Sequence, residues 1–372
     1  MKTPVVIIGG GPAGAASAIS LLRLGIRPTI VEKETFPRYH IGESMTGECG
    51  AVVRQLGFGS QMIDRGFPLK HGVKVFGQGA WFLPVMARNA DQGLEDQITW
   101  QVRRGEFDQM MLNAAIEQGA DYLPGHALKP LMTDDGAVRG VRVRTSDGST
   151  VDIASEMLLD CSGQSTFLAN AGATGPKYIG SYDRQIAVFS QVSTGLRDSG
   201  SERDAQPGNT LIFYRTKYHW AWWIPLNDDT VSVGIVVPAA YFQEQRMSKA
   251  EFLKKELHDI HPELKRRLPV VQLVEEARAV TNYSFQVKRF ADKGYICVGD
   301  AHRFVDPIFS FGLFVSLKEA TLAAAAAKSY IDGAGRDATD PFAAYRVYCE
   351  KGIDMLEDTI DTFWEFPLAF AR

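Results

Sequence analysis

Three glycines and one carboxylate near the start of the chain have the types and spacing that bind a dinucleotide. Gly9, Gly11 and Gly14 form a Gly-x-Gly-x-x-Gly pattern, and Glu32 follows them. In this pattern the first glycine permits a tight turn, the second lets the backbone approach a pyrophosphate, and the third lets helix and strand pack closely. A carboxylate about 20 residues further on accepts hydrogen bonds from ribose hydroxyls. The pattern predicts a dinucleotide site at a helix N-terminus. The N-terminus of a helix favours the negative charge of the pyrophosphate.

Two polar residues later in the chain favour FAD over NAD as that dinucleotide. Arg104 precedes the amphipathic segment 107–118, and its forked guanidinium could clamp a pyrophosphate. Asp300 ends an apolar run that begins at Tyr295, and its carboxylate could hold the ribityl chain. We therefore expect Glu32, Arg104 and Asp300 to surround FAD.

A cluster of tryptophans predicts a large aromatic surface on one strand. Residues 220–225 read Trp-Ala-Trp-Trp-Ile-Pro. Because side chains alternate along a strand, Trp220, Trp222 and Ile224 share one face and form a wall of large rings. Taken singly, any of these tryptophans is better explained as part of an ordinary strand core.

The segments around these residues predict the elements that position them. An apolar run over 5–8, the glycines and a helical pattern over 15–24 give strand, turn and helix, and a second strand runs over 28–31. Further along, the runs 218–226 and 231–237 flank a turn and predict a hairpin. The chain therefore combines a Rossmann-like unit with a β-rich segment.

Composition excludes several classes of protein. The 372 residues are 45% hydrophobic and 23% charged, as in globular chains with room for two domains. A net charge of -4 without a basic run argues against a nucleic-acid partner. The four cysteines have no CxxC spacing, which argues against a metal site and a secreted disulfide framework, so we expect a cytoplasmic protein. Glycines and Pro12 interrupt the uncharged segment 3–22, so no membrane insertion is predicted.

The glycine pattern at the N-terminus, with a Gly-Asp strand end near residue 300, resembles the FAD-dependent aromatic monooxygenase superfamily. That resemblance implies an α/β (α+β) fold, in which a Rossmann-like FAD-binding domain carries an inserted, mainly antiparallel β-sheet substrate domain. We expect the FAD-binding domain to be discontinuous over 1–71, 101–179 and 285–335, the substrate domain to occupy 72–100 and 180–284, and a C-terminal helical segment to occupy 336–372.

Three further segments resemble the flavin-dependent halogenases, of the phenol and pyrrole type. Residues 220–225 match that family's WxWxIP motif at every fixed position. Residues 67–72, Phe-Pro-Leu-Lys-His-Gly, resemble the segment that carries the family's essential lysine, which would be Lys70. Residues 304–312, Phe-Val-Asp-Pro-Ile-Phe-Ser-Phe-Gly, resemble the family's FxxPxxSxG loop.

This resemblance assigns roles to individual residues. Lys70 would hydrogen-bond hypohalous acid or become a haloamine, and desolvation would lower its pKa from the usual value of about 10.4. Trp220 and Trp222 would separate the flavin from the substrate. The backbone amides of Phe311 and Gly312, beside the loop serine, would hold halide at a helix N-terminus. Residues assigned by the resemblance alone to the loop or the cofactor are Ser310, Ala13, Pro307, Gly312 and Leu313.

The implied reaction uses reduced FAD, oxygen and chloride or bromide. FADH2 and oxygen would give a C4a-hydroperoxide, halide would attack it, and the hypohalous acid would reach Lys70 and halogenate an electron-rich ring. One nucleotide pattern is visible, so a separate NAD(P)H-dependent flavin reductase is expected as partner. Tryptophan halogenases carry an acidic residue where this chain has Phe309, so a phenol or pyrrole, free or on an acyl or peptidyl carrier protein, is the expected substrate.

Other interpretations stay open from the residues alone. A single-component aromatic hydroxylase using FAD and NAD(P)H would share the fold, although Lys70 and the tryptophan wall count against it. An isoprenoid-type flavin reductase is favoured only by fold analogy. A non-enzymatic FAD-binding module predicts bound FAD without turnover. The apolar end at 363–372 either covers the substrate cavity or exposes an apolar patch.

Overall fold

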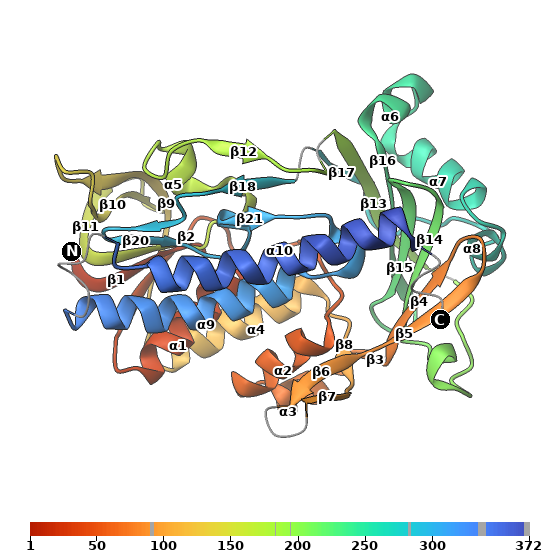
Figure 1. Cartoon of the computed structure of the whole chain (residues 1–372), viewed down its shortest axis with the longest axis horizontal. Helices are drawn as coiled ribbons and strands as arrows, with labels where there is room; N and C mark the ends of the chain where they lie inside the picture. Colours follow the sequence, from red (N-terminus) through yellow and green to blue (C-terminus); the bar gives the residue numbers. More distant parts are fainter. Residues whose placement is uncertain (90–92, 183, 194, 282–283, 334–339, 368–372) are drawn as a thin grey trace.

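The computed structural model describes the chain except for residues 90–92, 183, 194, 282–283, 334–339 and 368–372 (Figure 1). The last five residues of the predicted apolar end therefore lie outside the described residues. Two seven-stranded sheets form the two ends of the molecule, and helices connect and cover them. The predicted fold class, a Rossmann-like FAD domain with a second, mainly antiparallel sheet, is confirmed.

The first sheet carries the glycine-rich turn and has a parallel centre. β1 pairs in parallel with β2 and β11, β2 pairs with β9, and β11 pairs with β20. The long strands β9 and β11 extend beyond this centre and hold β10 between them in antiparallel pairing. The strands are β1 (Lys2–Ile8), β2 (Pro28–Glu32), β9 (Asp121–Met132), β10 (Val138–Thr145), β11 (Thr150–Asp160), β19 (Ala291–Asp292) and β20 (Tyr295–Cys297).

Helices α1 (Pro12–Arg23), α4 (Arg104–Glu117) and α9 (Gly312–Ile331) pack beside one another along this sheet (Figure 1). The facing surfaces of α1 and α9 are rich in buried alanine, including Ala15, Ala18, Ala320 and Ala324. Small side chains let the two helix backbones approach closely. Both helices begin at the cavity described below, so their packing fixes the position of their N-termini.

The second sheet is antiparallel except where β14 pairs in parallel with β4. Its order is β17-β13-β16-β15-β14-β4-β5. One face packs against α7 (Lys249–Asp259) and α8 (Pro262–Arg267), whose apolar residues join a core cluster with Trp223. The strands are β4 (Gly72–Phe76), β5 (Ala80–Pro84), β13 (Gln185–Ser193), β14 (Thr210–Thr216), β15 (His219–Pro225), β16 (Thr230–Pro238) and β17 (Arg278–Thr281).

Helix α10 (Ala343–Glu365) runs along the molecule from the first sheet to the second (Figure 1). Tyr345 and Cys349 belong to the core around the first sheet, whereas Ile360, Phe363 and Trp364 pack with aromatic residues of the second. We keep the predicted domain division as a proposal, supported by strands of each sheet that fall within its ranges. Among the described residues, no helix has the length and apolar character needed to span a bilayer.

Shorter elements complete the chain. They are α2 (Gly47–Gln55), α3 (Gly59–Asp64), α5 (Phe167–Asn170), α6 (Ala239–Gln245), β3 (Leu69–Lys70), β6 (Met86–Asn89), β7 (Gly93–Asp96), β8 (Thr99–Trp100), β12 (Lys177–Ile179), β18 (Phe285–Val287), β21 (Arg303–Phe304) and the 3-10 turns η1 (Gly163–Ser165), η2 (Arg203–Ala205), η3 (Gly299–Ala301) and η4 (Pro307–Phe309). The pair β3–β8 is important for the site because it carries Lys70.

Candidate active site

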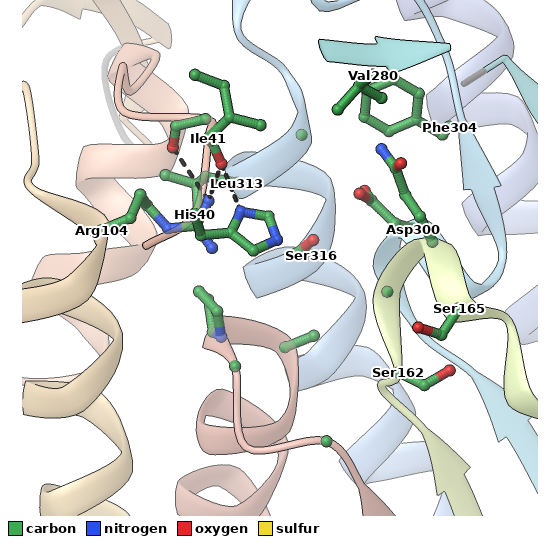
Figure 2. Close-up of a pocket in the computed structure, with 18 of the residues that line it drawn as sticks. His40, Ile41, Arg104, Ser162, Ser165, Val280, Asp300, Phe304, Leu313 and Ser316 are labelled. Carbon is green, nitrogen blue, oxygen red and sulfur yellow. Dashed lines mark hydrogen bonds between the residues drawn. The ribbon is translucent and has the colours of Figure 1, made fainter. Parts of the chain in front are cut away.

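A cavity of about 920 Å³ extends from the glycine-rich turn of the first sheet to the tryptophans of β15. Figure 2 shows part of it, with Arg104 and Ile41 on one side and Asp300 and Ser162 on the other. Gly14 and Lys70 are predicted site residues that do not belong to the described lining. The predicted site residues that line the cavity are Gly9, Gly11, Ala13, Glu32, Arg104, Trp220, Trp222, Asp300, Pro307, Ser310, Phe311, Gly312 and Leu313.

The glycine turn has the geometry of a dinucleotide cradle. Gly9 has a φ of 102°, and a Cβ atom there would lie 2.4 Å from the carbonyl oxygen of Cys161. A Cβ atom on Gly14 would lie 1.9 Å from the carbonyl oxygen of Gly9. Neither Gly9 nor Gly14 can therefore carry a side chain. Gly14 serves the packing of the helix against the strand, and Gly11 and Ala13 line the cavity.

Glu32 is fixed at the end of β2 by backbone amides. The N–H of Gly10 donates to Oε2 at 2.6 Å, and the N–H of Glu34 donates to Oε1 at 2.7 Å. Each carboxylate oxygen accepts more than one hydrogen bond, so both oxygens retain acceptor capacity toward the cavity. This geometry fits ribose hydroxyl donors.

The guanidinium of Arg104, predicted to clamp the pyrophosphate, is held by protein groups in this structure. Its Nε and Nη2 donate to the buried carboxylate of Asp108 at 2.7 and 3.0 Å, and its Nη1 donates to the carbonyls of Ile41 and Gly42 at 2.7 and 3.2 Å (Figure 2). Both ends of the guanidinium are thus engaged by the protein. Arg104 holds the segment after β2 against α4, and its role toward a pyrophosphate stays a prediction.

Arg38 is the arginine that reaches the glycine turn. Its Nη2 lies 3.3 Å from the point where a Cβ atom of Gly11 would stand. Ion pairs with Glu34, at 3.1 Å, and Asp108, at 3.3 Å, hold the side chain over the cavity. A guanidinium beside the amides of the turn fits a pyrophosphate. Sequence reasoning missed Arg38 because it follows β2 in a segment without a regular pattern.

Asp300 lies across the cavity from Arg104 (Figure 2). Burial raises the pKa of its carboxyl group to about 7. The backbone N–H of Gly299, in the same turn, donates to Oε2 of Glu319 at 2.8 Å, and Oε1 of Glu319 lies 2.8 Å from Nδ1 of His302. A residue of α9 therefore fixes the Gly-Asp turn, and the Asp300 carboxyl group, which also has a hydrogen bond with Gln164, faces the cavity.

The tryptophans of β15 form the opposite end of the cavity. Trp220 and Trp222 line it, with ring centroids 5.9 Å apart, and Nε1 of Trp222 donates to Oγ of Ser232 at 3.2 Å. A Cβ atom on Gly234 would lie 2.2 Å from the Trp222 ring. The rings are therefore packed tightly against β16 and form a rigid wall.

The loop before α9 presents free backbone amides. Ser310 adopts a left-handed conformation with a φ of 61°, and α9 begins at Gly312. Within the described part of the chain, the N–H groups of Phe311 and Gly312 have no hydrogen-bond acceptor, as expected for the first turn of a helix. Amides of this kind fit a halide ion. Burial raises the pKa of the neighbouring Asp306 to about 7.

Lys70 is enclosed rather than open to the cavity. It is 1% exposed, and its Nζ donates to Oγ of Ser44 at 2.8 Å and to the carbonyl of Met45 at 2.9 Å. Burial lowers the pKa of this lysine to about 7. The neighbouring Lys74 is instead paired with Asp204 at 2.6 Å. Of the two lysines in the segment, Lys70 has the environment of a reactive amine.

Glu43 is a buried carboxylate that sequence reasoning missed. It lines the cavity, and Nε2 of Gln191 donates to its Oε1 at 3.2 Å. Its Oε2 has no hydrogen-bond partner among the described residues. Burial raises its pKa to about 7, although hydrogen bonds with Ser232 and Gln191 and the charge of Arg104 oppose this. A lone glutamate after β2 has no local pattern that would have identified it.

A dinucleotide cradle, a cavity and an aromatic wall on a second sheet define a flavoprotein of the monooxygenase type. The family model of the FAD binding domain matches residues 2–346. The chain is 38% identical to the 1H-pyrrole-2-carbonyl-[peptidyl-carrier protein] brominase of Pseudoalteromonas luteoviolacea, over 98% of this chain and 86% of the relative. It is 31% identical to the tryptophan 2-halogenase of Chondromyces crocatus, over 89% of this chain and 62% of that relative.

A solved structure agrees with these relatives. The flavin-dependent brominase Bmp2 superposes with a TM-score of 0.90 and 36% sequence identity, over all of this chain and 89% of the brominase. The chain therefore belongs to the FAD-binding family and, within it, to the flavin-dependent halogenases. The predicted FAD, oxygen and halide are confirmed, and so is the prediction of an oxidoreductase. The hydroxylase, reductase and non-enzymatic interpretations give way to the halogenase.

Proposed function

We propose that this enzyme halogenates a pyrrole ring held on a carrier protein, with chloride or bromide as the halogen source. The supporting observation is the 38% identity, over 98% of the chain, to a brominase named for that substrate. A pyrrole chlorinase of Pseudomonas fluorescens is 29% identical over 86% of the chain. Phe309, at the position where tryptophan halogenases carry an acid, also favours a substrate other than tryptophan.

The residues of the first sheet would hold the cofactor. Glu32 would bind the ribose, Arg38 and the glycine turn the pyrophosphate, and Asp300 the ribityl chain. When bound and reduced, FAD supplies with oxygen the oxidising equivalents that convert halide into hypohalous acid. A separate NAD(P)H-dependent reductase would deliver reduced FAD. We place the enzyme in the cytoplasm, where Cys49, Cys161, Cys297 and Cys349, all buried and unpaired, stay reduced.

The loop before α9, the tryptophans of the second sheet and Lys70 would separate oxidant from substrate and direct the halogen. The amides of Phe311 and Gly312 hold the halide, and Trp220 and Trp222 keep an organic ring from reaching the flavin. A hypohalous acid molecule is small enough to pass the rings and reach the polar groups around Lys70. Lys70 then directs the halogen to the ring of the substrate.

The test is product analysis with matched lysine variants. Purified enzyme receives reduced FAD, oxygen and bromide or chloride, with carrier-bound pyrrole-2-carbonyl, free pyrrole-2-carboxylate or a phenol, and products are identified by mass spectrometry. We expect halogenated carrier-bound pyrrole, its loss in Lys70→Ala, and its retention in Lys74→Ala. Halogenation of phenol but not of the carrier-bound ring would overturn the substrate assignment, and activity in Lys70→Ala would overturn the role of that lysine.

A further inference from the structure

Two hydroxyl groups that line the cavity are connected to Lys70 by hydrogen bonds. Oγ of Ser44, which accepts from Lys70, lies 2.9 Å from Oγ1 of Thr210, and Ser44 and Thr210 both line the cavity. Lys70 lies behind them, on the pair β3–β8, outside the described lining. In this structure, hydrogen bonds therefore connect this amine to the cavity through Ser44, and through Ser44 to Thr210.

The hydrogen bonds in this row have one direction. An ammonium group only donates, so Ser44 accepts from Lys70 and has its own proton available for Thr210. Nε2 of Gln101 also donates to Oγ1 of Thr210, at 2.8 Å. That nitrogen donates to the carbonyl of Gly208 at 2.9 Å as well, which identifies it as the amide nitrogen. With both lone pairs of its oxygen engaged, Thr210 retains its own O–H as a donor.

Thr210 presents that donor on the face of the wall. β14 pairs with β15 in the register Ile212–Trp222, and Thr210 lies two residues before Ile212. Side chains two residues apart share a face of a strand. Thr210, Ile212, Trp220 and Trp222 all line the cavity, which confirms that they share one face. The Thr210 hydroxyl is therefore in the region where hypohalous acid would pass the rings.

We infer that Lys70, Ser44 and Thr210 form a proton relay, and that Thr210 is the residue that contacts hypohalous acid. The inference rests on the proposed function. As the halogen–carbon bond forms and the oxygen–halogen bond breaks, the leaving oxygen takes the proton of Thr210. Thr210 takes the proton of Ser44, and Ser44 takes one from Lys70, which becomes a neutral amine. The leaving group departs as water.

The same row then restores the lysine. After the first transfer each hydroxyl proton points back toward Lys70, so the row can carry a proton only in the reverse direction. The proton lost by the halogenated carbon passes to the newly formed water, and that water gives a proton to Thr210. Ser44 returns one to Lys70. The sum is a ring C–H and hypohalous acid converted into a ring carbon–halogen bond and water, with the relay unchanged.

The surroundings of Lys70 suit a reversible donor. The titratable group that acts on it is the thiol of Cys49, on α2. Burial raises the pKa of Cys49 to about 12, so the thiol is neutral at physiological pH. No carboxylate pairs with the Lys70 ammonium within the described chain. Without a counter-charge, the buried ammonium gives up its proton near neutral pH.

Thr210→Val tests the relay because it removes the hydroxyl and keeps the shape of the side chain. We expect halogenated product per reduced flavin to fall about 100-fold, the lower end of what a general acid contributes. Thr210→Ser should keep near wild-type product. Thr99→Val is the matched control, since Thr99 is buried opposite Lys70 in the β3–β8 pair and its Oγ1 has no hydrogen-bond partner among the described residues.

Two further readouts separate a relay from a purely structural role. In the wild type, product per reduced flavin should fall as pH rises through the pKa of Lys70, and this decline should disappear in Thr210→Val. Free hypohalous acid, trapped with monochlorodimedone, should rise in Thr210→Val because its formation does not use the relay. FAD titration and thermal denaturation of each variant establish that it is folded.

The results distinguish the relay from the proposed function. Product formation by Thr210→Val at the wild-type rate, or a loss that is equal at every pH without more trapped hypohalous acid, would overturn the relay. If the wild type traps hypohalous acid but halogenates no pyrrole, the substrate assignment fails. In that case the trapping and pH measurements are repeated with whichever ring the enzyme does halogenate.

Discussion

The two arginines near the first sheet give a prediction that separates cofactor binding from stability. Arg38→Gln removes the guanidinium closest to the glycine turn, with its Nη2 3.3 Å from the Cβ position of Gly11. Hydrogen bonds to a charged partner contribute about 1.5–3 kcal/mol, so FAD affinity should fall about 10- to 140-fold. Because the ion pair with Glu34 is half exposed, little stability should be lost with it.

Arg104→Gln should instead lower the free energy of unfolding more than it lowers FAD affinity. Arg104 and Asp108 form a buried pair, 7% and 0% exposed, with bonds of 2.7 and 3.0 Å. Removing one partner of a buried pair costs about 3–5 kcal/mol, and the low end applies here because Arg38 still faces Asp108. The free energy of unfolding should fall by that amount, and correctly folded Arg104→Gln should bind FAD more tightly than Arg38→Gln.

Flavin fluorescence titration and urea denaturation of the apo protein measure the two quantities independently. Asp108→Asn is a useful third variant, because it removes the carboxylate that both guanidinium groups contact without removing either guanidinium. The reasoning would be refuted if Arg104→Gln lost FAD affinity while keeping its stability and Arg38→Gln changed neither. The pyrophosphate would then be held as the sequence alone suggested.

Three more predictions follow from buried groups. Trp222→Phe removes the donor to Ser232 and part of the wall, so the folded variant should release more hydrogen peroxide per flavin oxidised, measured by peroxidase assay; unchanged coupling would make Trp222 a core residue only. Folding raises the pKa of Glu43 from 4.5 to about 7, so the wild type loses stability as pH rises between those values. Glu43→Gln should therefore be more stable than the wild type above pH 7. If the thermal denaturation temperatures of the two proteins change in parallel with pH, this prediction is contradicted. In the wild type, ionised Asp306 would repel halide near Phe311, so the KM for halide should rise above pH 7. Asp306→Asn should abolish that rise. Equal pH profiles of the KM in the two proteins would exclude the repulsion.

Local patterns predicted the parts of the site that depend on neighbours in sequence. The positive φ of Gly9 and the shared face of Trp220 and Trp222 both follow from short-range backbone geometry. The group that engages the Arg104 guanidinium is visible in the sequence. Asp108 lies four residues later on the same predicted helix, a spacing at which opposite charges pair. This i,i+4 spacing indicates that the Arg104 guanidinium has a partner within its own helix.

The environment of Lys70 could not be predicted in that way. Ser44, Gln101 and Thr210 come from three segments that are far apart in the chain. They meet because Ser44 bridges to Gln101, next to the strand that pairs with Lys70, and because Thr210 begins a strand of the second sheet. Each is a common polar residue without a distinctive spacing. Only the pairing of distant strands shows that their side chains form one hydrogen-bonded row.

The position of Thr210 on the second sheet also explains why the wall and the relay belong together. Trp222 is held by Ser232 and by close contact at Gly234, and its neighbour Trp223 packs into the core on the opposite face. Neither face of β15 can shift without creating a cavity or an overlap. Because β14 is hydrogen-bonded to β15, the Thr210 hydroxyl keeps a fixed position relative to the rings. In the proposed relay, a small oxidant that reaches the rings therefore meets its proton donor at a defined place.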